Sequence, residues 1–304
     1  MLQSVTCVTA ADCWAVGFAA YGFDDDPTPI EAEALHWDGH AWSAVPVPSP
    51  GGSQQGDETY LQAVTCSASA DCWAVGYDNP GAGLGSVVLH WDGHSWSQAA
   101  TPAPGQLFGV HCAARDNCWA VGTHPNASST LAATFTLRWN GNAWSQVRSP
   151  APNNNSILQG VSCTSATACW AAGGTGESPR GRNDVLRWNG HAWSHIATPD
   201  AGGTSGYSFL YAVRCSSAHN CWAVGGYQNG HSTGNQALHW NGHRWSVAPV
   251  PNPGPDYTPA LNAVTCSSAA SCWAVGDETA LHWNGHHWSA SRLPMAPSMI
   301  GRDL

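Results

Sequence analysis

One unit recurs six times along the chain at a period of roughly 50 residues, and this repeat constrains the fold more than any other feature of the sequence. Each unit reads L-x-(A/S/G)-V-x-C, five residues, C-W-A-(V/A)-G, a variable stretch, L-(H/R)-W-(N/D)-G-x-x-W-S and a proline-rich connector. The units open at Leu2, Leu61, Leu107, Leu158, Leu210 and Leu261. Three tryptophans in each unit account for all 18 tryptophans of the chain, so the large aromatic side chains are shared evenly among the repeats.

The residues inside a unit predict four short β-strands. L-x-A-V-x-C alternates, C-W-A-V-G is a brief apolar run, and no window has the periodicity of an amphipathic helix. An Asn-Gly or Asp-Gly pair before the last strand predicts a two-residue type I′ hairpin, because both central positions of that turn need positive φ. In such a hairpin Trp37 would face His40, and Leu35 would face Trp42. The six pairs are Asp38-Gly39, Asp92-Gly93, Asn140-Gly141, Asn189-Gly190, Asn241-Gly242 and Asn284-Gly285.

Four antiparallel strands repeated six times predict an all-β fold, a six-bladed β-propeller in which each blade packs on the next. We expect residues 1–290 to form this single propeller and residues 291–304 to form a C-terminal tail. A right-handed β-solenoid is the alternative, but its coils are usually shorter and lack tight antiparallel hairpins.

The positions of the chain ends predict how the ring would close. Leu2 begins a first strand and Trp288 belongs to a fourth strand, so each blade is expected to be complete in itself. Closure would then rest on side-chain packing between the first and sixth blades, with Trp14, Trp273 and their hairpin partners at the junction. The tail from Leu293 to Leu304 is a second candidate for closing the ring.

The 12 cysteines form pairs that lie six residues apart and bracket the turn between the first two strands of each unit. Facing positions of a hairpin place Cβ atoms about 4 to 5 Å apart, which suits a disulfide. We therefore expect one disulfide per blade, namely Cys7–Cys13, Cys66–Cys72, Cys112–Cys118, Cys163–Cys169, Cys215–Cys221 and Cys266–Cys272. A zinc site is the alternative, but zinc sites favour shorter cysteine spacings with a second pair nearby. Paired cysteines favour an extracellular or cell-surface location, although residues 1–7 lack the features of a signal peptide.

The charge balance argues against a nucleic-acid partner. The chain has no lysine, and 20 acidic residues face 10 basic ones, for a formal net charge of -10. Phosphate binding draws on clustered positive charge, which is lacking here. No run of about 18 apolar residues occurs, so no membrane-spanning helix is expected.

The strand motifs carry a family resemblance. L-x-A-V-T-C, C-W-A-V-G and H-W-N-G-H-x-W-S resemble the BNR-type, sialidase-like propeller repeats, especially those of assembly-factor propellers with a Gly-Trp-Ala-Val-Gly strand. The resemblance covers about residues 2 to 290 and implies a propeller fold. The tryptophan follows the aspartate by four residues, as in Asp38 to Trp42, whereas the family's Asp-box uses five. No sialidase arginine triad can be placed, so the resemblance does not imply sialidase chemistry.

The chain's 15 histidines raise the possibility of metal sites, because His-x-x-x-His recurs in four units, for example at His36 and His40. The expected hairpin puts these two imidazoles on opposite faces of the sheet, and arginine replaces the first histidine at Arg138 and Arg187. We therefore expect the histidines to pack structurally and expect neither a metal nor a cofactor. The repeated tryptophans could be sugar platforms, but their fixed positions in every blade favour packing between blades.

The connectors point to the binding face. In a four-stranded blade, the second-to-third and fourth-to-first connectors emerge on one face of the ring, and these are the segments that vary in length. Variable loops on a rigid scaffold are where binding residues collect. All seven tyrosines lie in or next to these connectors. The predicted ligand-binding residues are Tyr21, Asp24, Asp25, Asp26, Tyr77, Tyr207, Tyr227 and Tyr257, although the tyrosines could also pack on one another.

Acidic residues in the connectors leave a second functional class open. Asp24 to Asp26, with Glu31 and Glu33, could bind calcium, but without an Asp-x-Asp-x-Asp-Gly spacing we expect them to be solvated. The sequence favours a secreted binding or scaffold module for a carbohydrate or protein ligand. A glycoside hydrolase or polysaccharide lyase is the alternative, with carboxyls drawn from the same acidic stretch, Asp78, Glu177 or Asp256.

Overall fold

The 24 strands of the described residues form six four-stranded antiparallel units that follow the sequence repeat. A single parallel bridge between Ile30 and Glu58 joins the first two units into one eight-stranded sheet. The computed structural model describes residues 1–20, 29–52, 54, 56–79, 84–125, 132–152, 155–176, 181–230, 232–252, 260–276 and 279–291. Blade 1 contains β1 (Leu2–Thr9), β2 (Asp12–Ala20), β3 (Ile30–Trp37) and β4 (Trp42–Ala44). Blade 2 contains β5 (Glu58–Ala68), β6 (Asp71–Asn79), β7 (Gly85–Trp91) and β8 (Trp96–Gln98). Blade 3 contains β9 (Gln106–Ala114), β10 (Asn117–Pro125), β11 (Ala132–Trp139) and β12 (Trp144–Gln146).

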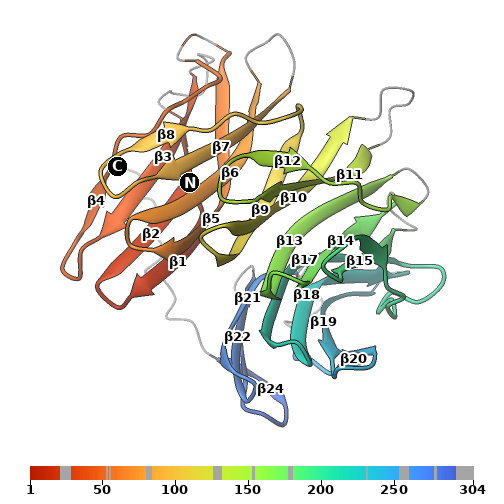
Figure 1. Ribbon diagram of the computed structural model, residues 1–304. Helices are drawn as coiled ribbons and strands as arrows, with labels where there is room; N and C mark the ends of the chain where they lie inside the picture. The colour runs from red at the N-terminus through yellow and green to blue at the C-terminus, as the bar shows by residue number, and fades with distance from the viewer. Residues whose placement is uncertain are drawn as a thin grey trace, which may run out of the picture.

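The last three blades repeat the same order. Blade 4 contains β13 (Ser156–Ser165), β14 (Ala168–Thr175), β15 (Arg182–Trp188) and β16 (Trp193–His195). Blade 5 contains β17 (Tyr207–Ser217), β18 (Asn220–Asn229), β19 (Ser232–Trp240) and β20 (Trp245–Ala248). Blade 6 contains β21 (Leu261–Ser268), β22 (Ser271–Gly276), β23 (Thr279–Trp283) and β24 (Trp288–Ser291). The chain is therefore an all-β propeller of six blades, whose first strands lie toward the centre (Figure 1).

Each blade is stapled by the predicted disulfide at its first hairpin. Cys7 pairs with Cys13 across β1 and β2, with Cα atoms 3.9 Å apart, and the other five bonds occupy the same register. All 12 cysteines lie among the described residues, and none of them is free. The bonds indicate a non-reducing environment.

The second hairpin differs from the predicted two-residue turn in all six blades. Trp37 pairs with Trp42, which leaves a four-residue loop, and the corresponding tryptophans pair in the other blades. Asp38 Oδ1 accepts backbone N–H bonds from His40 at 2.8 Å and Ala41 at 2.9 Å. These side-chain bonds form a local turn of their own, which competes with the type I′ geometry. Gly39 has φ +93°, and an added Cβ would lie 2.8 Å from the Ala11 Cβ, so glycine also allows the two turns of the blade to touch.

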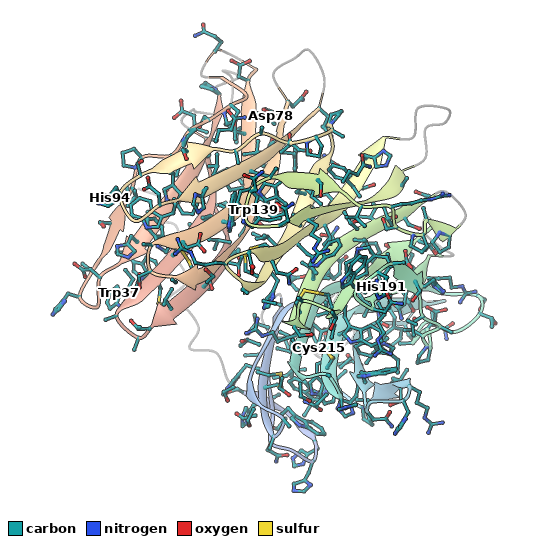
Figure 2. All side chains as sticks on the ribbon, in the orientation of Figure 1. Trp37, Asp78, His94, Trp139, His191 and Cys215 are labelled. Carbon is teal, nitrogen blue, oxygen red and sulfur yellow. A yellow bond between two sulfur atoms is a disulfide. The ribbon has the colours of Figure 1, made fainter. Side chains whose placement is uncertain are left out.

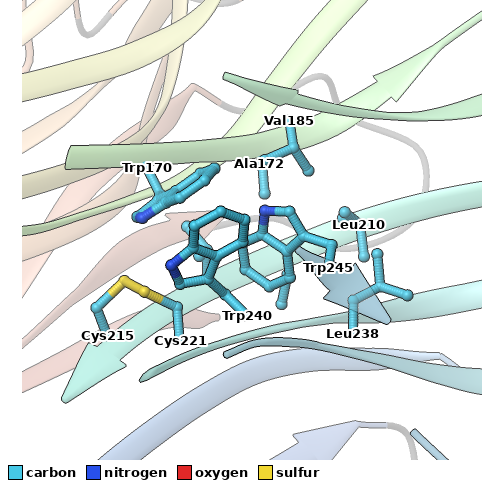
Figure 3. Packing of buried hydrophobic residues seen from close by; sticks show 11 residues of the cluster. Trp170, Ala172, Val185, Leu210, Cys215, Cys221, Leu238, Trp240 and Trp245 are labelled. Carbon is cyan, nitrogen blue, oxygen red and sulfur yellow. A yellow bond between two sulfur atoms is a disulfide. The ribbon is translucent and has the colours of Figure 1, made fainter. Parts of the chain in front are cut away.

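Tryptophan triads form the core between neighbouring blades. Trp170 of blade 4 packs on Trp240 at 4.7 Å and, edge to face, on Trp245 at 5.2 Å, both from blade 5 (Figure 3). Aliphatic residues such as Leu210 and Leu238 complete this cluster and are fully buried. The same triad occurs at the other four interfaces from blade 1 to blade 6. Burial of these aromatic rings supplies the main apolar contribution to stability.

The predicted closure of the ring through Trp14 and Trp273 is wrong, and the tail from Leu293 to Leu304 lies outside the described residues. Trp14 does not face Trp273; its ring lies 4.7 Å from Trp91 and 5.1 Å from Trp96 in blade 2, and Trp273 is 42% exposed. Blade 6 and blade 1 lie apart in Figure 1, so the six blades follow an open arc. The sequence repeat defines each interface but carries no direct measure of the angle between blades, and that angle decides whether six units close.

Candidate functional site

The two ends of each blade are built from different chemistry. Both hairpin turns of a blade meet at one end, which we call the tight-turn end; there Trp91 Nε1 donates to the Ser69 carbonyl at 3.1 Å. The opposite end, which we call the connector end, carries the segments that join second to third strands and one blade to the next. Figure 2 places Asp78 and His94 at opposite ends of blade 2. The expectation that variable connectors share one end is consistent with this strand order.

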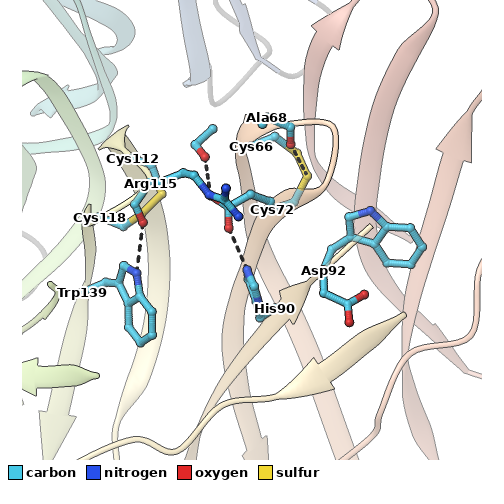
Figure 4. Close-up of polar contacts among 12 residues, drawn as sticks. Cys66, Ala68, Cys72, His90, Asp92, Cys112, Arg115, Cys118 and Trp139 are labelled. Carbon is cyan, nitrogen blue, oxygen red and sulfur yellow. Dashed lines mark hydrogen bonds and ion pairs between the residues drawn. A yellow bond between two sulfur atoms is a disulfide. The ribbon is translucent and has the colours of Figure 1, made fainter. Parts of the chain in front are cut away.

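Histidine side chains at the tight-turn end have structural partners. His90 stacks on Trp73 with ring centroids 4.3 Å apart, and its Nε2 lies 2.7 Å from Asp71 Oδ1. Arg115 of blade 3 adds an ion pair, with Nε 3.5 Å from Asp71 Oδ2 (Figure 4). His94, in the adjacent loop, is exposed. Among the described residues, no three His, Cys, Asp or Glu side chains form a group suited to a metal ion.

Four aromatic side chains form a continuous row at the connector end of blades 1 to 3. Phe18 of β2 meets Tyr60 of β5 edge to face at 4.8 Å, Tyr60 lies 4.9 Å from Tyr77 of β6, and Tyr77 lies 6.2 Å from Phe108 of β9. All four rings are half-buried. We call this set the aromatic row. Each ring contacts its neighbour, and two of the three contacts join different blades, so the row presents a continuous partly exposed aromatic surface that is fixed before any ligand arrives.

A carboxylate and an amide give the aromatic row a polar border. Asn79 Nδ2 donates to Glu58 Oε2 at 3.3 Å. Burial raises the pKa of Tyr60 above its ordinary value, and the charge of Glu58 raises it further. The pKa of Tyr77 is raised by the same two causes in the same order. Both phenols are therefore neutral hydroxyl groups at physiological pH. The Tyr60 hydroxyl bonds to Glu58, and the Tyr77 hydroxyl can donate a hydrogen bond to a ligand.

Blade 5 carries a second aromatic group near its connectors. Tyr207 stacks on Phe209 at 6.1 Å, and Phe209 lies 5.1 Å from Tyr211. Burial raises the pKa of Tyr207 to about 12, with a smaller contribution from Tyr211. Tyr227 lies over Gly234, where an added Cβ would be 2.5 Å from the Tyr227 ring.

The structure therefore brings only some of the predicted binding residues together. Tyr77 belongs to the aromatic row, whereas Tyr207 and Tyr227 lie in blade 5. Tyr21, Asp24, Asp25, Asp26 and Tyr257 lie outside the described residues. Ligand binding by any of these residues remains a prediction.

Sequence reasoning missed the phenylalanines of the row. Phe18 occupies the same repeat position as Tyr77, directly after C-W-A-V-G, and Phe108 follows the opening leucine of its unit. The available signal was an aromatic residue at a repeat position where most other units carry a small or amide side chain. The contacts between blades could not be read from one unit at a time.

Two carboxyl groups near the connector ends are buried. Burial raises the pKa of Asp78, and backbone N–H groups, chiefly that of Gly85, oppose the rise. Burial raises the pKa of Asp184 to about 7, opposed by the neighbouring Ser156 hydroxyl. His195 Nε2 lies 3.6 Å from Asp184 Oδ1. Of the candidate catalytic carboxyls, Asp78 is described and buried, whereas Glu177 and Asp256 lie outside the described residues.

A hollow of about 330 Å³ lies beside blade 3, and its lining residues differ from those of the aromatic row. Its walls include His124 and Thr134 from the second and third strands and Arg148 from the following connector. Among the described residues, neither a predicted binding residue nor a member of the aromatic row lines it. The hollow is therefore distinct from the aromatic row.

Comparison with known proteins supports the fold. No protein-family model matches the sequence, and no curated protein matches it. A solved structure described as "YCF48 bound to D1 peptide" is similar over 95% of this chain and 81% of that chain, with a TM-score of 0.55 and 13% sequence identity. A structure of YjhT is similar over 81% of this chain and 83% of that chain, with a TM-score of 0.47 and 13% identity.

In the described part of the chain, no helix has the length and apolar character needed to cross a membrane.

Proposed function

We propose that this protein is a secreted binding module that holds an extended ligand, a carbohydrate or a protein segment, along the aromatic row. The observation that carries the proposal is the unbroken contact from Phe18 to Phe108 across three blades. Aromatic surfaces suit both ligand classes, because they stack on sugar rings and on apolar side chains while tyrosine hydroxyls supply hydrogen bonds. One structural neighbour, YCF48, is described as bound to the D1 peptide.

The geometry of the row favours binding over a purely structural role. Its rings are half-buried, whereas the tryptophans between blades are buried almost completely. A row held by mutual contacts loses little side-chain entropy when a ligand binds, which improves affinity. Glu58 and Asn79 beside the row can accept and donate hydrogen bonds, and can therefore orient a polar ligand.

The experiment is a screen of the full chain against a glycan array and a library of extended peptides, followed by titration of the recovered probe. Tyr77→Ala should weaken binding by roughly tenfold or more, because a central anchor of an interface contributes more than its rim. Tyr60→Phe should cause a smaller loss, since it keeps the ring and removes only the hydroxyl.

His94→Ala is the matched control, because His94 lies in the same blade at the tight-turn end. It should bind the probe as the parent does. Tyr227→Ala asks separately whether the site extends to blade 5. Unchanged affinity in Tyr77→Ala would refute the proposal, and binding lost in His94→Ala would place the site at the tight-turn end instead.

A further inference from the structure

Two faces of the molecule expose side chains that the other blades bury. On blade 1, Leu2 is 50% exposed and Trp42 is 46% exposed; on blade 6, Trp273 is 42% and Val275 44% exposed. The counterparts of Trp42 in blades 2 to 6 are 4–5% exposed, and those of Trp273 in blades 1 to 5 are 0–3% exposed. We call the two exposed faces together the seam. Apolar surfaces of this kind mark an interaction site.

The two faces match the two sides of the interface between neighbouring blades, which occurs five times along the chain. At each internal interface, the second-strand tryptophan of one blade packs on the hairpin tryptophans of the next, as Trp222 does on Trp283 at 4.8 Å and Trp288 at 5.0 Å. Trp273 makes its described ring contact with His282 of its own blade. Trp37 and Trp42 contact each other at 5.8 Å. Blade 6 therefore offers one half of a triad, and blade 1 offers the other.

The halves do not meet, although all five internal triads are complete. Strand contacts link each blade to the next from blade 1 to blade 6, and no comparable pairing links the described strands of blade 6 to those of blade 1. In Figure 1, β21, β22 and β24 lie apart from β1–β4. The arc of six blades is therefore not closed. An element that fills the seam must be thick enough to contact both blade 6 and blade 1, and it must carry both halves of the tryptophan triad.

We propose that the seam binds one further four-stranded blade with the same tryptophan repeat, supplied by polypeptide outside residues 1–304. Its hairpin tryptophans would pack on Trp273, and its second-strand tryptophan would pack on Trp37 and Trp42. Blades 2 to 5 each carry both halves on a single unit, so a blade is the element that satisfies both faces at once. A second copy of this chain carries its open halves on two different blades and would fill the seam only within a larger assembly.

The test is hydroxyl-radical footprinting of the full chain and of two fusions, which add a copy of blade 2 or of blade 3 at the C-terminus. In the chain alone, Trp42 should oxidise about ninefold faster than Trp96, in proportion to their exposed fractions of 46% and 5%. In the fusions, the oxidation rates of Trp42 and Trp273 should fall to those of Trp96 and Trp222. A matched fusion whose added blade has all three tryptophans changed to alanine should leave both residues exposed.

Three results would overturn the proposal. Protection of Trp42 and Trp273 in a monomeric chain would show that blade 6 closes directly on blade 1. The same protection in an oligomer, measured by light scattering, would identify a second copy as the occupant. Exposure that neither fusion reduces would show that a blade of this repeat does not fit the seam.

Discussion

The two ends of the blades show how a repeat protein separates scaffold from recognition. At the tight-turn end, the same contacts recur in all six blades: a disulfide, a tryptophan that donates to a turn carbonyl, and an Asp or Asn side chain that closes the last loop. At the connector end, equivalent positions carry unrelated residues, such as Phe18, Thr123 and Gly174. The contacts that stabilise every blade recur in every repeat at the tight-turn end, whereas the residues at the connector end differ from blade to blade.

The largest expected difference in stability loss is between two substitutions in the same strand, β6. Trp73→Ala should reduce the free energy of unfolding by about 3 to 5 kcal/mol, because the indole is 2% exposed and packs on two tryptophans of blade 3. Tyr77→Ala, four residues further along, should cost about 1 kcal/mol or less, because its ring is half-buried. Urea unfolding measures both values. Equal losses would mean that the aromatic row is part of the core rather than a binding surface.

A second contrast concerns the pH dependence contributed by Asp184. Its folded pKa of about 7 lies above the ordinary value of 3.8, so folding favours the protonated form. The associated stability is present below pH 3.8 and is lost as pH rises through 7. Asp184→Asn should therefore be more stable than the parent at pH 8, by up to a few kcal/mol, and this advantage should shrink toward pH 4. Thermal melts at several pH values test this, and a parallel shift at all pH values would contradict it.

The pH dependence of stability contributed by Asp92, at the tight-turn end, should have the opposite sign to that of Asp184 and should be the smallest of these effects. Backbone N–H groups of Ser95 and then His94 hold its pKa below the ordinary value. Its contribution is present above pH 3.8 and is lost as pH falls through the depressed pKa. Asp92→Ala should lower the melting temperature slightly at pH 7. Asp92→Asn should keep the turn, because Asn140 accepts the same two backbone bonds in blade 3, and a melting temperature as low as that of the alanine variant would contradict this role.

The sequence was sufficient for features that lie within one repeat. Alternating residues and the six-residue cysteine offset predicted the strands and the disulfides, because both depend on local spacing. The Asp38 loop was mispredicted because its side-chain hydrogen bonds override the usual preference of an Asp-Gly pair. The contact between Phe18 and Tyr60 and the open seam at Trp273 depend on how one blade is placed against another, and no local pattern encodes that placement.

We propose that recognition occurs at the connector end, on a scaffold whose contacts repeat in every blade. Hydrogen exchange of the full chain, with and without the probe recovered from the array screens, tests it most directly. The account predicts slower exchange in the ligand complex at the backbone amides of Tyr60, Tyr77 and Phe108, and unchanged exchange in the tight-turn loop 92–95. Slower exchange confined to the tight-turn loops, with the amides of the aromatic row unaffected, would contradict it.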